Sequence, residues 1–295
     1  MNESRNGVLS AVAAFFLWGI LPIFWKSLSF IPPASIIAHR TLWSLLLLLP
    51  VLAGRRQLGE LFRSLAPRRG GGWHLLSGTL LAGNWLLYVW ATLNGRIIES
   101  ALGYYLNPFL NMLAGALFFG ERQNRLQLTA VAVAIAGVAC QLPAVKGIPW
   151  VALVLALSFS LYAVVRKKAP LGALAGLGAE TLMLAPVGLV WLLWQESQGA
   201  VIFGGSVPRA ALILCTGLAT ATPLLCFGHA ARTISLTTLG ILQFLAPTLQ
   251  FLIGWKFYGE AMSPLRLASF SLIWAAVAIY AANALRRPPE TQKAA

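Results

Sequence analysis

The chain of 295 residues is 58% hydrophobic and only 10% charged, with a mean hydropathy of +0.76. Soluble domains average about 25% charged residues, so this composition excludes a soluble globular protein and favours a polytopic helical membrane protein. The net charge of +14 does not indicate nucleic-acid binding, because the basic residues lie in short loops between apolar runs and not on one soluble face.

Apolar runs close to 20 residues long recur along the chain, and each can cross a hydrocarbon core of about 30 Å. They predict an all-α polytopic membrane protein with ten transmembrane helices joined by short connections. In chain order the predicted spans are 7–25, 35–53, 73–94, 99–119, 126–142, 148–165, 171–194, 209–231, 237–258 and 264–285.

Basic residues in the connections predict the orientation of the spans. An even number of spans puts both termini on one side. With the termini inside, 15 Lys and Arg residues fall in inner segments and six in outer ones, while Arg40 lies within the second span. Cytoplasmic loops of membrane proteins carry this excess of positive charge, so we expect cytoplasmic termini.

A repeat divides the chain into two halves. The segment LNPFLNMLAGALFFGE at 106–121 recurs as LAPTLQFLIGWKFYGE at 245–260, with eight of sixteen positions identical at an offset of 139. The halves, 7–142 and 148–285, each hold five predicted spans, and because five is odd the second half enters the membrane from the opposite face. Two inverted five-helix repeats are a common plan for secondary transporters, which hold the substrate between the repeats and alternate its access to the two sides.

Charged and titratable side chains within the spans are candidates for a functional site, because such groups are costly in hydrocarbon and turn towards a partner or a water-filled cavity. Glu180 lies near the middle of the seventh span, and His39 and Arg40 lie in the second. At an offset of 141, Glu180 aligns with His39. These residues either bind a charged solute or carry a proton, or Arg40 and Glu180 form a structural ion pair between the halves; the sequence leaves both alternatives open.

Amide and aromatic side chains form stripes along three of the spans. Residues three, four or seven positions apart share a face of a helix, and the repeat places amides at equivalent positions in both halves. We expect these residues to line a solute path, the alternative being that they form hydrogen bonds between helices. They are Asn84, Trp85 and Tyr88 in the third span, Tyr104, Asn107 and Asn111 in the fourth, and Gln243 and Gln250 in the ninth.

Two prolines and two aromatic residues add to this set. Pro108 and Pro247 lie several residues into the fourth and ninth spans, where proline frees a backbone carbonyl and bends a helix. Discontinuous helices often mark transport sites, and a tolerated kink is the alternative. Trp18 and its repeat counterpart Tyr162 lie deep in their spans, where we expect them to contact an apolar solute.

The sequence predicts no cofactor and no metal site. The three cysteines lie within apolar spans without metal-ligand spacing, the three histidines are far apart, and no phosphate-binding GxxxxGK[ST] loop occurs. A membrane enzyme usually has acidic or histidine clusters near an interface. The sequence therefore favours a transporter, with a non-transporting membrane protein, either an enzyme or a structural partner, as the alternative.

Motifs in order along nearly the whole chain carry a family resemblance. They are Phe16-Leu17-Trp18-Gly19-Ile20, His39-Arg40 with Trp43-Ser44, Gly83-Asn84-Trp85-Leu86-Leu87, Leu102-Gly103-Tyr104-Tyr105-Leu106-Asn107-Pro108, Val165-Arg166-Lys167-Lys168, Pro223-Leu224-Leu225-Cys226-Phe227 and Phe257-Tyr258-Gly259-Glu260. They resemble the RarD group of the EamA family, in the drug/metabolite transporter superfamily. The resemblance implies a ten-helix transporter of the bacterial inner membrane and an association with chloramphenicol sensitivity.

The resemblance supplies neither a substrate nor binding residues, so the site residues above rest on burial and repeat symmetry alone. The resulting hypothesis is a secondary or facilitative transporter of a small organic solute, a metabolite or a drug such as chloramphenicol. Its partners are then the solute and the lipid bilayer, with protons as a coupling ion if Glu180 titrates during transport.

Overall fold

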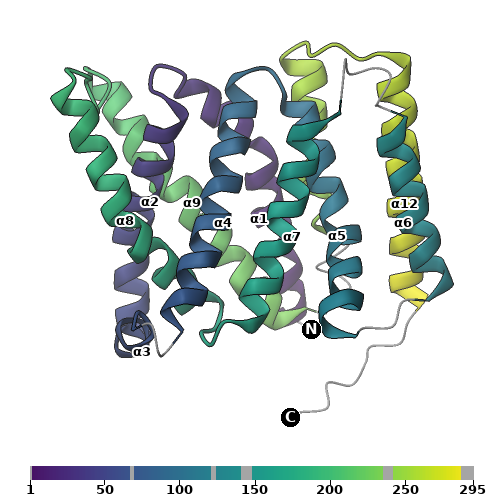
Figure 1. Ribbon diagram of the computed structural model, residues 1–295, viewed down its shortest axis with the longest axis horizontal. Coiled ribbons are helices and arrows are strands. Elements are labelled where there is room, and N and C mark those ends of the chain that lie inside the picture. The colour runs from purple at the N-terminus through teal and green to yellow at the C-terminus, as the bar shows by residue number, and fades with distance from the viewer. Residues whose placement is uncertain (1, 67–69, 121–123, 141–147, 235–241, 287–295) are drawn as a thin grey trace.

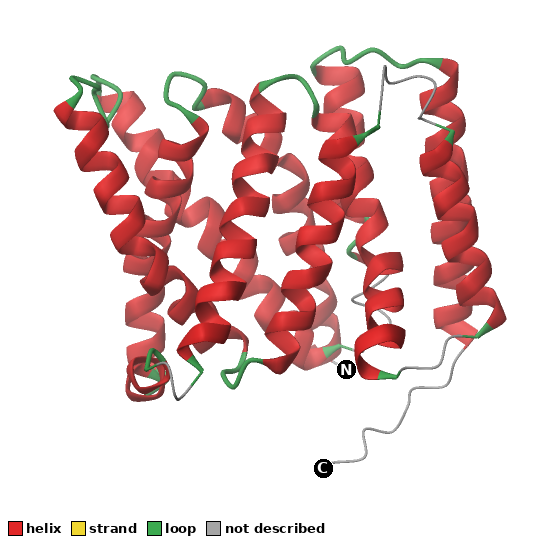
Figure 2. Ribbon diagram, in the orientation of Figure 1, coloured by secondary structure: helices red, strands yellow, loops and turns green. Residues whose placement is uncertain are grey.

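The structure is a computed structural model that describes residues 2–66, 70–120, 124–140, 148–234 and 242–286. Within these ranges the chain forms helices joined by short connections and no strand (Figure 2). The helices, labelled in Figure 1 where there is room, are α1 (Asn2–Ser27), α2 (Pro33–Gly54), α3 (Leu58–Ser64), α4 (Gly71–Leu93), α5 (Ile97–Phe119), α6 (Arg125–Ala139), α7 (Trp150–Lys168), α8 (Ala173–Ser197), α9 (Val207–Thr233), α11 (Leu245–Leu252), the π-helical segment η2 (Ile253–Phe257) and α12 (Pro264–Arg286).

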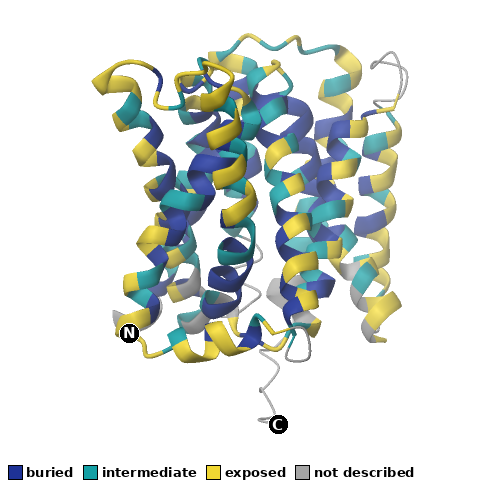
Figure 3. Ribbon diagram, turned by 60° about the vertical axis from the view of Figure 1, so that its left-hand side comes forward, coloured by how far each residue is buried: buried dark blue, intermediate teal, exposed yellow. Residues whose placement is uncertain are grey.

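The described residues confirm the all-helical part of the predicted fold class, with several apolar helices. Five stretches are long and apolar enough to cross a membrane by length and composition, namely Arg5–Ser27, Pro33–Gly54, Leu174–Ser197, Val207–Phe227 and Pro264–Ala282. Two further apolar helices, Arg125–Ala139 and Trp150–Arg166, are shorter. Large apolar side chains such as Leu117 and Val207 are 78% and 84% exposed on the outside of the bundle, while its interior is buried (Figure 3). An apolar surface of this kind suits lipid as its solvent.

Helix α3 was not expected, because residues 54–72 were predicted to form a loop. Leu61 has no exposed surface and packs with Leu52 and Leu177 in one apolar cluster, so the connection between α2 and α4 folds back as a helix against α8. The burial of one leucine therefore gives this charged connection a fixed position.

The two prolines of the repeat have different surroundings. Pro108 lies inside α5, which continues through it. Residues 237–241 of the ninth predicted span lie outside the described residues, and residues 243–244 form a turn directly before α11. Pro247 therefore lies in the first helical turn after an interruption, where its missing N–H is tolerated. The predicted discontinuity is present at Pro247, and at Pro108 the helix is not interrupted.

Helices of the two halves pack against each other more than against their own half. In the first half, α1 contacts α9 and α11, α2 contacts α8 and α9, α4 contacts α7 and α8, α5 contacts α7 and α11, and α6 contacts α12. Some crossings are close: a Cβ built on Gly103 of α5 would lie 2.8 Å from the carbonyl oxygen of Ala152 on α7. The halves thus interlock, and a site at their contact is shared by both.

The two ends of the bundle can be told apart in Figure 1. The N-terminal end holds the start of α1, helix α3, the α7–α8 connection and the end of α12. The opposite end holds the α1–α2, α4–α5 and α8–α9 connections. The depth of each polar residue can therefore be described by its distance from one of these two ends.

Candidate functional site

A buried polar cluster surrounds Glu180, the eighth residue of α8. Glu180 itself is 1% exposed. Ser77 of α4 donates its hydroxyl to Glu180 Oε1 at 2.6 Å, and Arg166 Nε on α7 is 3.3 Å from the same oxygen. The hydroxyl of Tyr162, also on α7, donates to Oε2 across 3.4 Å. These four residues, the Glu180 cluster, join three helices around one carboxylate and balance its charge with an arginine.

The ion pair between Arg40 and Glu180, one of the two alternatives from the sequence, does not form. Helices α2 and α8 run in opposite directions, and Gly188 of α8 packs against Ala38 of α2. Glu180 lies eight residues before Gly188, whereas Arg40 lies two residues after Ala38, so the two charges are about 9 Å apart along the bundle. Because α2 and α8 run in opposite directions, the alignment of Glu180 with His39 in the sequence does not bring the two side chains together.

His39 joins α2 to the α8–α9 connection. Its side chain is buried, its Nε2 donates to the carbonyl oxygen of Ile202 at 2.9 Å, and its ring lies against Phe203 at 5.4 Å between centroids. The Nε2 atom carries the proton in this arrangement, because a carbonyl oxygen can only accept. The structure thus places His39 in a packing contact near the opposite end of the bundle.

Arg40 lies among aromatic rings. Its guanidinium carbon is 3.8 Å from the centroid of Trp85 on α4 and 5.1 Å from that of Trp25 on α1. Tyr88 and Tyr104 pack edge to face, 5.4 Å apart, in the same apolar cluster as Trp25. We call these five residues the Arg40 cluster. Aromatic faces attract a cation, so the rings stabilise the charge of Arg40 within the bundle.

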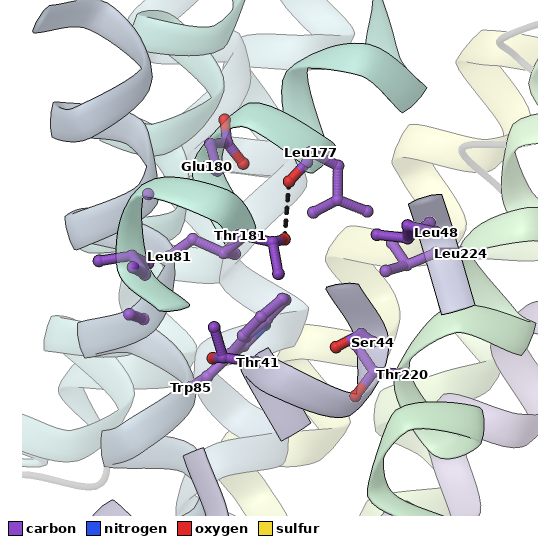
Figure 4. A pocket seen from close by; sticks show the side chains of 13 residues that line it. Thr41, Ser44, Leu48, Leu81, Trp85, Leu177, Glu180, Thr181, Thr220 and Leu224 are labelled. Atoms are coloured by element: carbon purple, nitrogen blue, oxygen red, sulfur yellow. Dashed lines mark hydrogen bonds between the residues drawn. The ribbon is translucent and has the colours of Figure 1, made fainter. Parts of the chain in front are cut away.

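A small cavity lies between α2, α4, α8 and α9, and Glu180 and Trp85 lie on different sides of it (Figure 4). The space open to the centre of a water molecule is about 10 Å³, which is roughly what one water needs. Leucine side chains and four hydroxyl groups complete the wall, the latter from Thr41, Ser44, Thr181 and Thr220.

The hydroxyl groups of the cavity are available mainly as acceptors. Ser44 donates to the carbonyl oxygen of Arg40, Thr181 to that of Leu177 at 2.7 Å and Thr220 to that of Thr216 at 2.9 Å. Each hydroxyl oxygen keeps lone pairs for a group in the cavity. The cavity can therefore receive a water or a small polar group by hydrogen bonds, beside one carboxylate and one aromatic ring.

Among the other predicted residues, Asn84 and Gln250 form hydrogen bonds between helices. Asn84 Nδ2 donates to the carbonyl oxygen of Leu155 at 2.8 Å and to Ser158 Oγ at 2.9 Å, both on α7. Gln250 is buried on α11 and donates to the carbonyl oxygen of Trp18 at 3.2 Å. Both amides thus make the contacts that were the alternative interpretation of the stripes.

The remaining stripe residues and Trp18 do not meet at the cavity. Asn107 is buried on α5, Asn111 is exposed one turn further along, and Gln243 is half-buried in the turn before α11. Trp18 packs with two phenylalanine rings at 5.6 and 5.7 Å. Of the thirteen candidate residues, Trp85 and Glu180 line the cavity directly, and Arg40, Tyr88, Tyr104 and Tyr162 contact one of these two or its cluster.

Sequence reasoning missed Arg166 and the role of Glu260. Arg166 was counted as a loop charge that sets orientation, yet it lies inside α7 and pairs with Glu180. Glu260, half-buried in the connection before α12, accepts the N–H groups of Ile97 at 2.7 Å and Ile98 at 3.0 Å, at the start of α5. The available signal was the recurrence of the Gly-Glu turn in both halves, which marked Glu260 without indicating its partner.

A lipid-facing helical bundle with charged groups and hydroxyls in its interior defines a multi-pass membrane protein with a polar core. The EamA-like transporter family matches residues 5–142. The relatives described next match nearly the whole chain, and the chain therefore belongs to this family, as its motifs indicated.

The relatives are bacterial. Protein RarD of Salmonella typhi is 39% identical over 96% of this chain and 97% of its own length. An uncharacterized transporter of Pseudomonas aeruginosa is 42% identical over 97% of both chains. A solved crystal structure, described only as that of a protein, is 20% identical and covers 96% of this chain and 99% of its own with a TM-score of 0.61, so the two share a fold.

Proposed function

We propose that this protein is a secondary or facilitative transporter of a small organic solute, a metabolite or a drug such as chloramphenicol. In this proposal ten helices cross the bacterial inner membrane as two inverted five-helix repeats, 7–142 and 148–285. The solute binds at the contact of the repeats, and alternating access delivers it from one side to the other. The names of the relatives, a RarD protein and an uncharacterized transporter, agree with this class.

The helix contacts support a two-fold relation between the halves. Exchanging the halves replaces α1 by α7, α2 by α8, α4 by α9, α5 by α11 and α6 by α12. The contacts α1–α9, α2–α9 and α5–α7 then become α7–α4, α8–α4 and α11–α1, and all of these occur. The contacts α2–α8, α5–α11 and α6–α12 map onto themselves. In Figure 1, α1 and α7 run in opposite directions, as inversion requires.

The observation that carries the proposal is the position of the cavity. Its wall comes from α2 and α8 and from α4 and α9, which are equivalent pairs under the exchange. Leu81 and Trp85 of α4 and their equivalents Thr220 and Leu224 of α9, at an offset of 139, all line it. A cavity on the two-fold axis is accessible from either side when the halves exchange conformations. With room for about one water, it must widen to admit a solute.

The transport experiment uses the purified full-length chain in liposomes with labelled solutes, chloramphenicol among them, under pH gradients of either sign. Uptake above that of protein-free liposomes supports the proposal. Thr220→Val removes a cavity hydroxyl at nearly equal volume and should slow transport several-fold. Cys215→Val, on the exposed face of the same helix, should not change it. A folded protein that moves no solute would refute the proposal and support the alternative, a non-transporting membrane protein.

Proton coupling is tested on the same liposomes. Glu180 is the only carboxylate among the residues that line the cavity, so we propose that it carries the proton if transport depends on a pH gradient. Glu180→Gln should then abolish the dependence while solute exchange without a gradient continues. An unchanged dependence would remove Glu180 from this role.

The proposed orientation, with cytoplasmic termini, is tested by cysteine labelling in intact cells. After the three native cysteines are replaced by serine, single cysteines are introduced at Glu60, on α3, and at Ser206, before α9, both exposed. A membrane-impermeant maleimide should label position 206 and leave position 60 unlabelled until the cells are opened. The reverse pattern would overturn the orientation.

A further inference from the structure

Arg40 is a buried cation without an acidic partner among the described residues. It is 4% exposed, and the two ion pairs of this part of the chain, Arg166–Glu180 and Arg96–Glu99, do not include it. An unpaired charge in a membrane interior is costly and marks a functional site more often than a structural one. The burial of an unpaired guanidinium therefore indicates that the Arg40 cluster has a functional role.

The aromatic rings satisfy only the faces of the guanidinium. Trp85 stacks on it at 3.8 Å, and Trp25 lies at 5.1 Å. The N–H groups of an arginine lie in the plane of the guanidinium and point to its edge, where they bind carboxylate oxygens in pairs. Stacking thus stabilises the charge without satisfying the edge donors, and Arg40 Nε has no hydrogen-bond partner among the residues that the structure describes.

Further donors around Arg40 also lack acceptors. Within the described part of the chain, the fully buried indole Nε1 of Trp25 has no hydrogen-bond partner, and the hydroxyl of Tyr88 makes no hydrogen bond of acceptable geometry. These groups and Arg40 Nε belong to one cluster of contacting rings. Buried donors are normally paired, so a group of them without an acceptor indicates that the missing partner supplies acceptor oxygens.

We propose that Arg40 binds the carboxylate of the transported solute, with Trp25, Trp85, Tyr88 and Tyr104 around the solute's apolar or aromatic body. This inference rests on the proposed transport function and names its substrate class, a small organic monocarboxylate. It explains an interior that carries a positive charge, hydrogen-bond donors and aromatic surface in one place.

The path to Arg40 leads through the cavity. Thr41 and Ser44, the first and fourth residues after Arg40, line the cavity, and Trp85 both lines it and covers the guanidinium. Figure 4 shows the Trp85 ring beside Thr41 at the cavity wall. A solute in the widened cavity is thus one indole ring away from Arg40, and its carboxylate reaches the guanidinium when Trp85 turns aside.

The test compares carboxylates with their uncharged amides. Binding of phenylacetate and phenylacetamide, benzoate and benzamide, and hexanoate and hexanamide to the purified full-length protein is measured by titration calorimetry, with sulfate as an inorganic anion. Each carboxylate should bind at least tenfold more tightly than its amide, and sulfate should not displace it. Equal binding of each pair, or displacement by sulfate alone, would overturn the proposal.

Two variants locate the effect. Arg40→Gln should lower carboxylate affinity at least tenfold and leave amide affinity unchanged, and Arg40→Lys, which keeps the charge but loses the planar pair of donors, should give a smaller loss. Arg209→Gln removes an exposed arginine near the same end of the bundle and should change neither. Full carboxylate affinity in folded Arg40→Gln would refute the assignment, and if that variant does not fold, Arg40→Lys and the amide pairs still decide.

The outcome separates this inference from the proposed function. Transport of uncharged solutes with no preference for carboxylates would support the proposed transport function and refute the proposed role of Arg40. Carboxylate binding that depends on Arg40, in a protein that moves no solute in liposomes, would support the binding site and refute the proposed transport function.

Discussion

Removal of both partners of the Arg166–Glu180 pair should destabilise the protein by less than the sum of the two single removals. Glu180 keeps 2% and Arg166 14% of its side-chain surface exposed, and their closest atoms are 3.3 Å apart. Breaking a buried pair by removing one partner costs about 3–5 kcal/mol, because the other charge is left uncompensated. The residual exposure of Arg166 puts Glu180→Gln, which strands the better hydrated charge, at the lower end of this range.

The double variant isolates the interaction. In Arg166→Met with Glu180→Gln no charge is stranded, and the side-chain amide introduced at position 180 can still accept the hydrogen bond of Ser77. We therefore expect the pair of substitutions to cost less than the sum of the single ones by roughly 1.5–3 kcal/mol, within the range of coupling energies between contacting residues. A methionine at position 166 keeps most of the aliphatic packing of the arginine stem.

The measurement is thermal unfolding of the purified protein in detergent, followed by tryptophan fluorescence. At roughly 2 °C per kcal/mol for a chain of this size, single substitutions should lower the midpoint by about 6–10 °C, with Glu180→Gln near the lower value. Glu60→Gln, which removes an exposed glutamate on α3, is the control and should stay within about 0.5 kcal/mol of the parent. If the two single shifts simply add in the double variant, the pair contributes no coupling and the reasoning fails.

Two further predictions concern the ends and crossings of helices. Glu260→Gln replaces one of the two oxygens that accept the N–H groups of Ile97 and Ile98 and should cost about 1–2 kcal/mol in the same unfolding assay. Burial raises the pKa of the Glu260 carboxyl above its ordinary value. The contribution of Glu260 to the free energy of unfolding is therefore complete below the unfolded-state pKa and is lost as pH rises through the folded-state pKa. The difference in stability between the parent protein and Glu260→Gln should shrink from acidic to neutral pH, and a difference that grows with pH would contradict this expectation. Gly103→Ala puts a methyl group 2.8 Å from a carbonyl oxygen of α7 and should destabilise by about 1–3 kcal/mol, whereas Gly83→Ala, with open space around it, should be neutral or stabilising; equal effects would show that the crossing relaxes freely.

The helices could be predicted from the sequence because in a membrane chain hydropathy and helix formation coincide. A run of apolar residues has no water to satisfy its backbone, so it must form its own hydrogen bonds. Helix α3 escaped prediction for the complementary reason. Its seven residues include two charges, and only the burial of Leu61 against α8, a long-range contact, fixes it.

The candidate site was found in part, because the cost of burying polar groups identifies residues but not their partners. Glu180 and Arg40 were marked by their charge within apolar spans, and both are buried. The sequence left open whether the two form an ion pair, and they do not, because positions that align in a sequence repeat need not lie close together in space. Arg166 was missed because an arginine two residues before the end of a helix has the same sequence signal whether it faces solvent or reaches back to a buried carboxylate.

Periodicity had the same limit for the amide stripes. Spacing of three, four or seven residues places side chains on one face of a helix, but depth along the helix decides what each one meets. On α5, Asn107 is buried and Asn111, one turn later, is exposed. Asn84, expected either in a solute path or in a hydrogen bond between helices, donates to α7, because the crossing of α4 and α7 brings a carbonyl oxygen within 2.8 Å of its amide.

Under the proposed exchange of the halves, the two charged clusters occupy equivalent depths from opposite ends of the bundle, with the cavity between them. Their chemistry is opposite: one holds a carboxylate already balanced by Arg166, the other a guanidinium with unused donors. An exchange of conformations would therefore present the cavity to different charges on its two sides, even though the proposed repeats are equivalent in backbone. The binding free energy of an anionic solute then differs between the two access states, because only the side that uncovers Arg40 offers it a counter-charge. A preference of this kind must come from side chains that break the repeat, and His39-Arg40 opposite Glu180-Thr181 is where the aligned sequences of α2 and α8 differ in charge.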